Sequence, residues 1–306
     1  MYKYIIYDMR VLSYYILNGI TPEDYVGDPD IVFDSSNKYN YIISKKNKHT
    51  NGITELYFED NYLVLRNGQE WELTIFKNGK QILINEKCKD LQCALSILLG
   101  TGLSLLMLYR NRIPLHASGI VMKDNVIGFM GRSGVGKSTF LRFLLQKGYK
   151  VLTEDTLLIE NKGNIEVIPT RNIKAKLKGD TISYLKIDAC HVGEYIDKGD
   201  KYWVEIPKEN RCLDRKYLKH VYILQPQDDN TDIYINKIEG RDKYTKLREN
   251  TNCIRNLPAG DASRVIKSLQ FIAKEITVFE ICYPLGIEFL DKILECIIKN
   301  EETDFE

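Results

Sequence analysis

Through residue 88, the chain carries short runs rich in β-branched and aromatic residues, separated by turn-forming residues. Asn51-Gly52, Asn67-Gly68 and Asn78-Gly79 are dipeptides typical of tight hairpin turns. The runs between the turns read YKYIIY, DIVFD, YNYIISK, TELYF, YLVLR, WELTIF and QILI. We therefore predict a small β-rich N-terminal domain over residues 1–90, built as an antiparallel sheet with a structural or partner-binding role.

The next segment, Cys93 to Tyr109, is uncharged and approaches the length of a membrane span. Gly100, Thr101 and Gly102 interrupt it, and it leads directly into a region patterned like a soluble nucleotide-binding core. We therefore predict a fully buried helix here rather than a membrane segment.

After this segment, apolar positions alternate between the spacing of strands and that of helices, as in an α/β core. We predict a second domain over residues 91–306, so the fold class is α/β, or more broadly α+β. The lysine-rich piece 171–178 is predicted to be a loop and the acidic end 301–306 to be frayed. Strands are predicted at 113–122, 126–130, 150–153, 156–160, 165–168, 221–224, 233–238 and 276–282, and helices at 138–147, 262–274 and 285–299.

Composition narrows the possible partners and location. Lys and Arg total 43 against 42 Asp and Glu, so no global field favours nucleic acid or an anionic membrane. The seven cysteines form no CxxC pair or zinc-like cluster, which indicates reduced thiols and a cytoplasmic protein. The N-terminus shows no secretion signal. Arg171 with Lys174–Lys178 is either a solvated face or a patch that attracts an acidic peptide or product phosphates.

The segment GRSGVGKST fits the phosphate-loop pattern G-x-x-x-x-G-K-[ST], between an apolar strand and a helical pattern. Glycines let the backbone wrap around phosphate oxygens, and amides at the helix N-terminus donate to them. Lys137 would balance charge on the β and γ phosphates, and Ser138 would hold Mg²⁺ through its hydroxyl. The predicted ATP-binding residues are Gly131, Ser133, Gly134, Val135, Gly136, Lys137, Ser138 and Thr139.

Phosphoryl transfer to a hydroxyl also requires a residue that orients or deprotonates the acceptor. Glu154 and Asp155 follow an apolar strand, which would place both carboxylates at an exposed tip near the loop. An Asp at this position can also simply cap a turn. His116 lies one hairpin before the loop in an otherwise apolar strand. Alone, such a histidine is more often a hydrogen-bonded core residue, but its position makes it a candidate.

Taken together, LHASGIVMKDNVIGFMGRSGVGKSTFLRFLLQKGYKVLTEDTLLI resembles the catalytic core of the HPr serine kinase family, which shares its fold with phosphoenolpyruvate carboxykinase. The resemblance covers about 45 residues without a break. The family places a histidine before the loop, a Lys/Arg-Gly pair after its helix, and two acidic residues after the next strand. Here these are His116, Lys147-Gly148 and Glu154-Asp155.

The resemblance implies a PEP carboxykinase-like P-loop core that binds ATP and Mg²⁺. In that core Asp155 takes the acceptor's proton, Lys137 holds phosphate, Ser138 binds magnesium and His116 supports the acidic pair. Glu154 stands where the family more often has Asp. Asp180 is the nearest candidate for a further acidic magnesium ligand. The family's assemblies also imply a homo-oligomer.

The wider layout is similar to HPr kinase-like proteins encoded with lasso-peptide and other ribosomal peptide pathways, which phosphorylate a precursor peptide. The similar features are the Tyr-rich first strand, LLGTGLSLLMLYR leading into PLHAS, and VFEICYP before the last helix. The glycine-rich signature that bifunctional HPr kinase/phosphorylases carry after the acidic pair is missing, so recognition of HPr and phosphorolysis are not implied.

The leading hypothesis is therefore an ATP- and Mg²⁺-dependent kinase that phosphorylates a serine of a lasso-type precursor peptide, with no nucleic-acid or membrane partner. Two alternatives stay open. The acceptor is HPr or a small molecule, or the chain is a nucleotide-binding regulator that transfers nothing. His116 and Asp155 argue against the regulator, because a switch needs the loop but no acceptor base.

Overall fold

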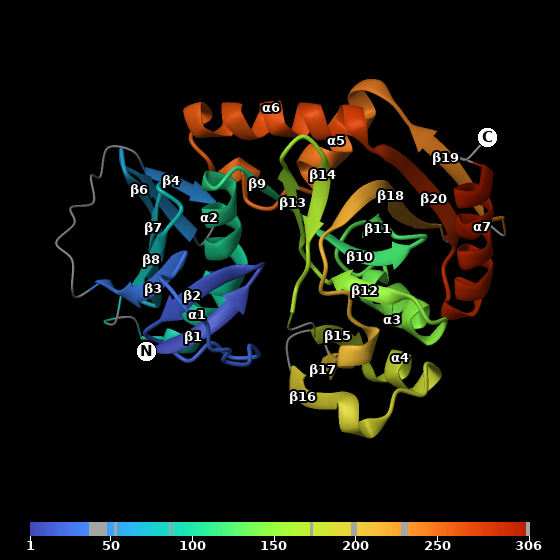
Figure 1. Ribbon diagram of the computed structural model, residues 1–306, viewed down its shortest axis with the longest axis horizontal. Helices are drawn as coiled ribbons and strands as arrows, with labels where there is room; N and C mark the ends of the chain where they lie inside the picture. The colour runs from blue at the N-terminus through green and yellow to red at the C-terminus, as the bar shows by residue number, and fades with distance from the viewer. Residues whose placement is uncertain are drawn as a thin grey trace. The chain divides into compact units, whose positions relative to one another are not determined.

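The computed structural model describes residues 1–36, 48–51, 54–85, 87, 89–171, 174–196, 201–227 and 232–303. The chain divides into two units (Figure 1). The first unit comprises Met1–Pro114 and Thr251–Ser268, and the second comprises Leu115–Asn250 and Leu269–Glu306. The first unit thus includes the apolar helical segment, which packs against the first sheet. The predicted domains 1–90 and 91–306 stay predictions. The fold class is mixed α/β, as predicted.

The first unit holds a sheet with the strand order β1-β2-β3-β8-β7-β6-β5-β4. The prediction of a wholly antiparallel sheet is wrong, since β3 runs parallel to both β2 and β8. Long connections before and after β3 return the chain in the same direction. The strands are β1 (Tyr2–Ile6), β2 (Met9–Ser13), β3 (Ile31–Ser35), β4 (Lys48–Asn51), β5 (Thr54–Phe58), β6 (Tyr62–Asn67), β7 (Trp71–Phe76) and β8 (Gln81–Ile84).

Two of the predicted turns join strands of this sheet. Gly68 and Gly79 adopt the positive φ angles of 50° and 71° that such turns require, between β6 and β7 and between β7 and β8. The predicted strand YNYIISK and Gly52 of the third turn lie outside the described residues.

The apolar segment is helical, and it is fully buried only in its second half; in its first helix Ala94 and Leu95 are buried and Leu91 is exposed. It consists of α1 (Leu91–Ile97), a π-helical turn (Leu98–Gly102) around the glycines, and α2 (Leu103–Tyr109), all seven residues of which are buried. Within the described ranges this is the one helix long and apolar enough to cross a membrane, and 56% of its most apolar window is buried inside the protein. That burial supports the predicted core helix, since core helices of soluble proteins also meet this length and composition.

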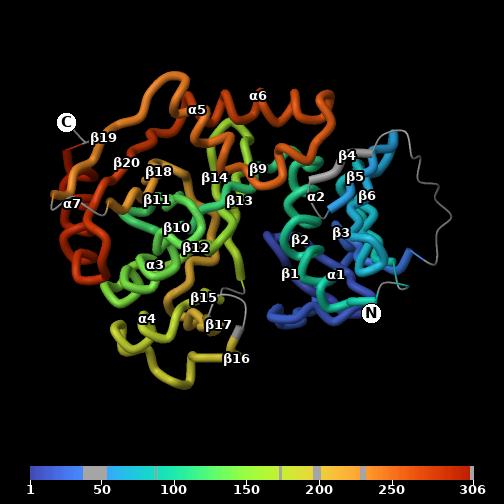
Figure 2. The backbone as a smooth tube through the Cα atoms, turned by 180° about the vertical axis from the view of Figure 1, so that it is seen from behind, coloured from blue at the N-terminus to red at the C-terminus, as the bar shows by residue number. Residues whose placement is uncertain are grey.

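The second unit is built on a mixed sheet with the order β12-β10-β11-β18-β14-β13, and β20 lies between β18 and β19. Helices α3 and α7 pack side by side on one face of it, where their apolar residues meet Phe129, Tyr222 and Ile281 (Figures 1 and 2). The strands are β10 (Ala117–Met122), β11 (Asn125–Met130), β12 (Lys150–Thr153), β13 (Leu157–Asn161), β14 (Ile165–Ile168), β18 (Lys216–Gln227), β19 (Tyr234–Ile238) and β20 (Thr277–Pro284); the helices are α3 (Lys137–Gln146), α5 (Gly240–Glu249) and α7 (Leu290–Thr303).

The chain passes between the units in β9 (Arg112–Leu115) and α6 (Ala259–Glu275). The strand predicted over residues 113–122 is therefore broken, because His116 forms a bend between β9 and β10.

Short 3-10 turns lie at Ala189–His191, Lys208–Asn210, Ile254–Asn256 and Ile287–Phe289.

A second, three-stranded sheet lies in the same unit, with β17 (Lys201–Glu205) between β15 (Lys174–Lys178) and β16 (Val192–Ile196). Helix α4 (Gly179–Tyr184) directly follows β15 in the chain. The prediction of a loop over residues 171–178 is wrong for Lys174–Lys178, which form β15. Its lysines alternate with Ala175 and Leu177, which are buried, and this alternation is that of a strand with one covered face.

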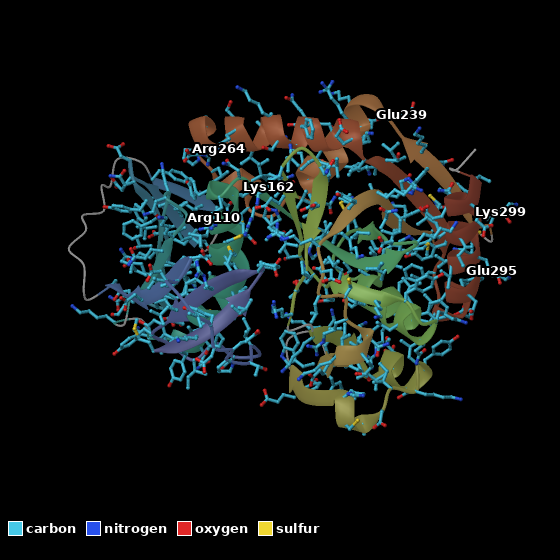
Figure 3. The ribbon with its side chains drawn as sticks, in the orientation of Figure 1. Arg110, Lys162, Glu239, Arg264, Glu295 and Lys299 are labelled. Atoms are coloured by element: carbon cyan, nitrogen blue, oxygen red, sulfur yellow. The ribbon has the colours of Figure 1, made fainter. Side chains whose placement is uncertain are left out.

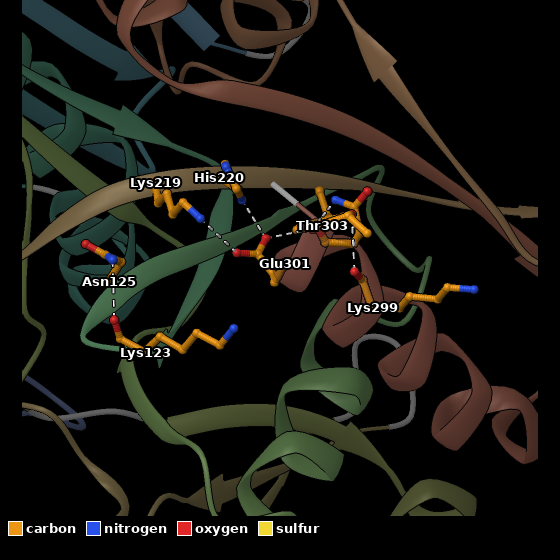
Figure 4. A network of polar contacts seen from close by, with 9 residues as sticks. Lys123, Asn125, Lys219, His220, Lys299, Glu301 and Thr303 are labelled. Carbon is orange, nitrogen blue, oxygen red and sulfur yellow. Dashed lines mark hydrogen bonds and ion pairs between the residues drawn. The ribbon is translucent and has the colours of Figure 1, made fainter. Parts of the chain in front are cut away.

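The predicted fraying at the C-terminus is also wrong as far as Thr303. Helix α7 continues to that residue, and Glu301 is buried beside His220 and Lys219 of β18 (Figure 4). Residues 304–306 lie outside the described chain.

Candidate active site

The pairing of β10 with β11 and β12 brings three segments to one edge of the sheet. Strand β10 is antiparallel to both neighbours, with Ala117 opposite Met130 and Gly119 opposite Thr153. The start of β10 therefore lies beside the ends of β11 and β12. The residue directly before the start of β10 is His116. The ends of β11 and β12 are directly followed by the loop that begins at Gly131 and by Glu154-Asp155. These predicted site residues therefore share one edge of the sheet.

The loop between β11 and α3 depends on glycines. Gly131, Gly134 and Gly136 have φ angles of 155°, 91° and 96°, which residues with a side chain rarely adopt. At Gly131 a Cβ atom would lie 2.8 Å from Cγ2 of Val135 and 3.1 Å from the carbonyl oxygen of Leu224. Ser133 and Gly134 are exposed, and Thr139 is half-buried.

The N-terminus of α3 carries the hydrogen-bond donors of the site. No side chain in the described part of the chain caps this helix. The first amides of a helix have no partner within it, and they carry the positive end of its dipole. The loop and helix start therefore form a cradle suited to an anion.

Lys137 is a buried cation, and no carboxylate of the described residues contacts it directly. Its Nζ donates to the carbonyl oxygens of Gly131, at 2.8 Å, and Arg132, at 3.2 Å. Burial lowers the pKa of Lys137, the carboxylates of Asp155 and Glu154 oppose that effect, and Lys201 adds to it. A buried ammonium held by neutral carbonyls leaves positive charge to be balanced, which suits a bound phosphate.

Ser138 and Glu154 form the polar pair beside Lys137. The Ser138 hydroxyl donates to Oε1 of Glu154 at 2.6 Å. Burial and the charge of Asp155 raise the pKa of Glu154 to about 7, against the opposing effects of Ser138, Lys176 and Lys137. The two neighbouring carboxylates concentrate negative charge here, and the oxygens of Ser138 and Glu154 could both bind a metal. A divalent cation would neutralise this negative charge.

Asp155 lies in a strained turn next to His116. Its φ of 64° falls in the left-handed region, and its side chain is 67% exposed. Nδ1 of His116 lies 3.2 Å from the carbonyl oxygen of Asp155 and 3.4 Å from its Oδ1. Because a carbonyl only accepts, the proton of the ring lies on Nδ1. Burial and Lys137 lower the pKa of His116, although Asp155 opposes them, which favours the neutral imidazole.

Asp180, the candidate for a further magnesium ligand, lies in the first turn of α4. Its Oδ1 accepts from the backbone amide of Thr181 at 2.6 Å and from the Thr181 hydroxyl at 3.3 Å. Among the residues that the structure describes, no group of three or more His, Cys, Asp or Glu side chains is placed to hold a metal. Ser138 and Glu154 are the oxygen ligands that the loop edge itself offers.

Sequence reasoning missed Tyr283 and Lys201. The Tyr283 hydroxyl, buried on β20, donates to the carbonyl oxygen of Val135 at 3.2 Å and so holds the loop from a position 148 residues away. No local signal reveals such a contact. Lys201 acts on Lys137 through its charge, and Lys176, which belongs to the lysine-rich stretch named from the sequence, acts on Glu154.

Comparisons with known proteins add a distant structural similarity. No protein-family model matches the chain, and no curated protein sequence matches it. Among solved structures, it is similar to the HPr(Ser) kinase/phosphatase from Coxiella burnetii, with a TM-score of 0.34 and 11% sequence identity. That similarity covers 63% of this chain and 92% of the other.

Proposed function

We propose that this protein is a kinase that uses ATP and Mg²⁺ to phosphorylate a hydroxyl group, and that its acceptor is a serine of a ribosomally made, lasso-type precursor peptide. The observation that carries the proposal is the buried Lys137 ammonium, which donates to two loop carbonyls, on the same sheet edge as the exposed Asp155. A triphosphate supplies the missing negative charge, and Asp155 lies where an acceptor can approach.

Each residue of the edge has a distinct task in this proposal. The loop amides and Lys137 bind the β and γ phosphates, and Ser138 with Glu154 would hold magnesium. Magnesium would neutralise charge that develops on the phosphate oxygens. Asp155 accepts the proton of the acceptor hydroxyl, and its exposure leaves its oxygens open to substrate.

His116 acts through Asp155. Its Nδ1 lies within reach of both the backbone and the side-chain oxygen of that residue, so it holds a turn whose backbone is strained. A neutral imidazole suits this task, because it donates one hydrogen bond without pairing fully with the carboxylate. These features favour transfer over a purely regulatory nucleotide site, which needs no such base.

The peptide acceptor and the cytoplasmic location are proposed from the sequence. The layout of the chain resembles the kinases of ribosomal peptide pathways, whose precursors are made in the cytoplasm. A serine near an end of such a peptide is short and accessible enough to reach an exposed carboxylate.

Mass spectrometry of the precursor encoded beside this gene, incubated with the protein and Mg-ATP, tests the proposal. We expect a phosphorylated serine, and a rate about 10²- to 10⁴-fold lower for Asp155→Asn. Asp242→Asn, an exposed aspartate of α5, is the matched control and should keep the wild-type rate.

Two outcomes would contradict parts of this proposal. Equal modification by wild type and Asp155→Asn would remove Asp155 as the base. Tight binding of Mg-ATP without transfer to the precursor, HPr or small hydroxyl compounds would favour the regulator instead.

A further inference from the structure

One face of β15 and β17 is lined with lysines. Residues directly opposite each other on paired strands project to the same side, and here Lys176 lies opposite Trp203 and Lys178 opposite Lys201. Lys174, two residues before Lys176, projects to that side as well. We call Lys174, Lys176, Lys178 and Lys201, with Trp203 among them, the lysine face.

The opposite side of the same strands fixes this orientation. Ala175, Leu177 and Val204 are buried there as a small core, with Ile182 and Ile187 packed against it. A shift of one residue would expose these apolar side chains and bury the lysines, so the register is strongly set. The lysine face is therefore a consequence of the fold and not of flexible side chains.

Among the described residues, none of the four lysines of the lysine face forms a direct ion pair with an acidic residue. Glu205, which lies opposite Lys174, pairs instead with Arg211 at 3.1 Å. The ammonium of Lys176 lies 4.6 Å from the centre of the Trp203 ring, which holds that charge in place without neutralising it.

The strands that carry the lysine face pack against the helix that begins at the phosphate loop. Strand β15 packs beside α3. Nη1 of Arg142 in α3 donates to the carbonyl oxygen of Glu205 in β17 at 3.2 Å. A ligand on the lysine face would therefore lie on strands that contact α3, whose N-terminus belongs to the candidate site.

Resting on the kinase function proposed above, we propose that the lysine face binds an acidic segment of the acceptor peptide that adjoins the phosphorylated serine. Alternate lysines along a strand are about 6.6 Å apart, the spacing of alternate side chains in an extended peptide. Three lysines thus match acidic residues at alternate positions over about 13 Å. ATP has its own cradle on the loop, so the lysine face is left for the acceptor.

A pair of synthetic peptides tests this inference. One carries a serine beside Glu at alternate positions, and the other has Gln in place of each Glu. The test variant carries Lys174→Gln, Lys176→Gln and Lys178→Gln. With wild type, we expect a KM about tenfold lower for the Glu peptide, as for several exposed charge pairs acting together. The test variant should lose this preference, measured as the ratio of the two KM values at saturating ATP.

The matched control removes the same amount of charge elsewhere in the second unit. Lys274→Gln, Lys292→Gln and Lys299→Gln change exposed positions on α6 and α7, and Lys299 lies on the outer side of α7 (Figure 3). This variant should discriminate between the peptides as wild type does. Loss of discrimination in the control would mean that net charge, not the lysine face, attracts the peptide.

Binding without ATP separates this inference from the kinase proposal. Fluorescence anisotropy of the labelled Glu peptide should show weaker binding to the test variant at low salt and little difference at high salt. This result without any transfer would uphold the acidic-peptide site and reject the kinase. Transfer with no preference between the two peptides would uphold the kinase and overturn the inference.

Discussion

The second unit holds two histidine–carboxylate pairs that differ in almost every physical respect. Nδ1 of His116 lies 3.4 Å from Oδ1 of Asp155, and the two side chains are 32% and 67% exposed. Nδ1 of His220 lies 2.5 Å from Oε1 of Glu301, and these side chains are only 3% and 4% exposed. The same two functional groups, an imidazole and a carboxylate, are thus paired once at an exposed sheet edge and once inside the core.

The partners of each carboxylate explain what the pairs can do. Oε1 of Glu301 accepts from His220 and from the hydroxyl of Tyr222, at 2.7 Å, and Oε2 lies 3.6 Å from Lys219 (Figure 4). Such a carboxylate fastens α7 to β18 and has no access to a substrate. Among the described residues, the carboxylate of Asp155 contacts His116 alone, and it is exposed. Exposure and unfilled hydrogen-bond capacity, rather than the residue pair itself, therefore mark the candidate base.

Exchanging each histidine for alanine should separate the two pairs most strongly. His220→Ala leaves Glu301 buried without its main partner, which should lower the free energy of unfolding by roughly 3–5 kcal/mol. His116→Ala removes a half-exposed ring, so stability should change little, but the rate of transfer should fall on the order of 10²-fold as Asp155 loses its position. Urea unfolding and initial rates on the same samples measure both effects.

The comparison fails if the effects are reversed. A stable His220→Ala protein would mean that the buried pair contributes little to the attachment of α7. Unchanged rates in His116→Ala, with Asp155→Asn still inactive, would limit His116 to a structural role.

The two glutamates of these regions should respond to pH in opposite directions. The pKa of Glu154 is raised to about 7 by burial, so the folded state holds its proton more tightly than the unfolded chain. Its contribution to stability is present at low pH and is lost as pH rises from about 4.5 through 7, by roughly 3 kcal/mol. Glu154→Gln should remove this loss, measured as a flatter plot of unfolding free energy against pH.

Glu301 supplies the internal control for that measurement. Burial acts to raise its pKa, but hydrogen bonds from His220 and Tyr222 outweigh this and hold the pKa below the usual value. Its contribution is therefore present above the unfolded pKa and lost as pH falls through the folded one. Glu301→Gln should change the acid side of the profile only. A Glu154→Gln profile identical to wild type would contradict the raised pKa.

The candidate site was largely predictable because its parts follow one another along consecutive elements. The loop, the acidic pair and His116 each adjoin a strand end, and antiparallel pairing of neighbouring strands brings such ends together. The roles of these residues stay predictions. The bend at His116, which separates β9 from β10, depends on backbone geometry, and the pattern of apolar residues does not reveal it.

Features that depend on distant partners were not predictable. Glu301 lies in an acidic run that favours a frayed end, and its partner His220 is 81 residues away. Strand β15 was overlooked because lysines dominate KAKLK, although Ala175 and Leu177 alternate with them. The parallel pairing of β3 likewise depends on connections whose course no local pattern specifies.

The smallest predicted effects come from removing one tyrosine hydroxyl in each region. Tyr222→Phe withdraws a hydrogen bond from the charged Glu301 and should cost about 2 kcal/mol of stability with no change in the KM for ATP. Tyr283→Phe withdraws a neutral hydrogen bond from the carbonyl of Val135, so it should cost only about 1 kcal/mol. Because Val135 belongs to the loop, that loss should raise the KM for ATP by up to about fivefold. Equal KM values in both variants would mean that the loop keeps its shape without Tyr283, and that the two regions differ in their carboxylates alone.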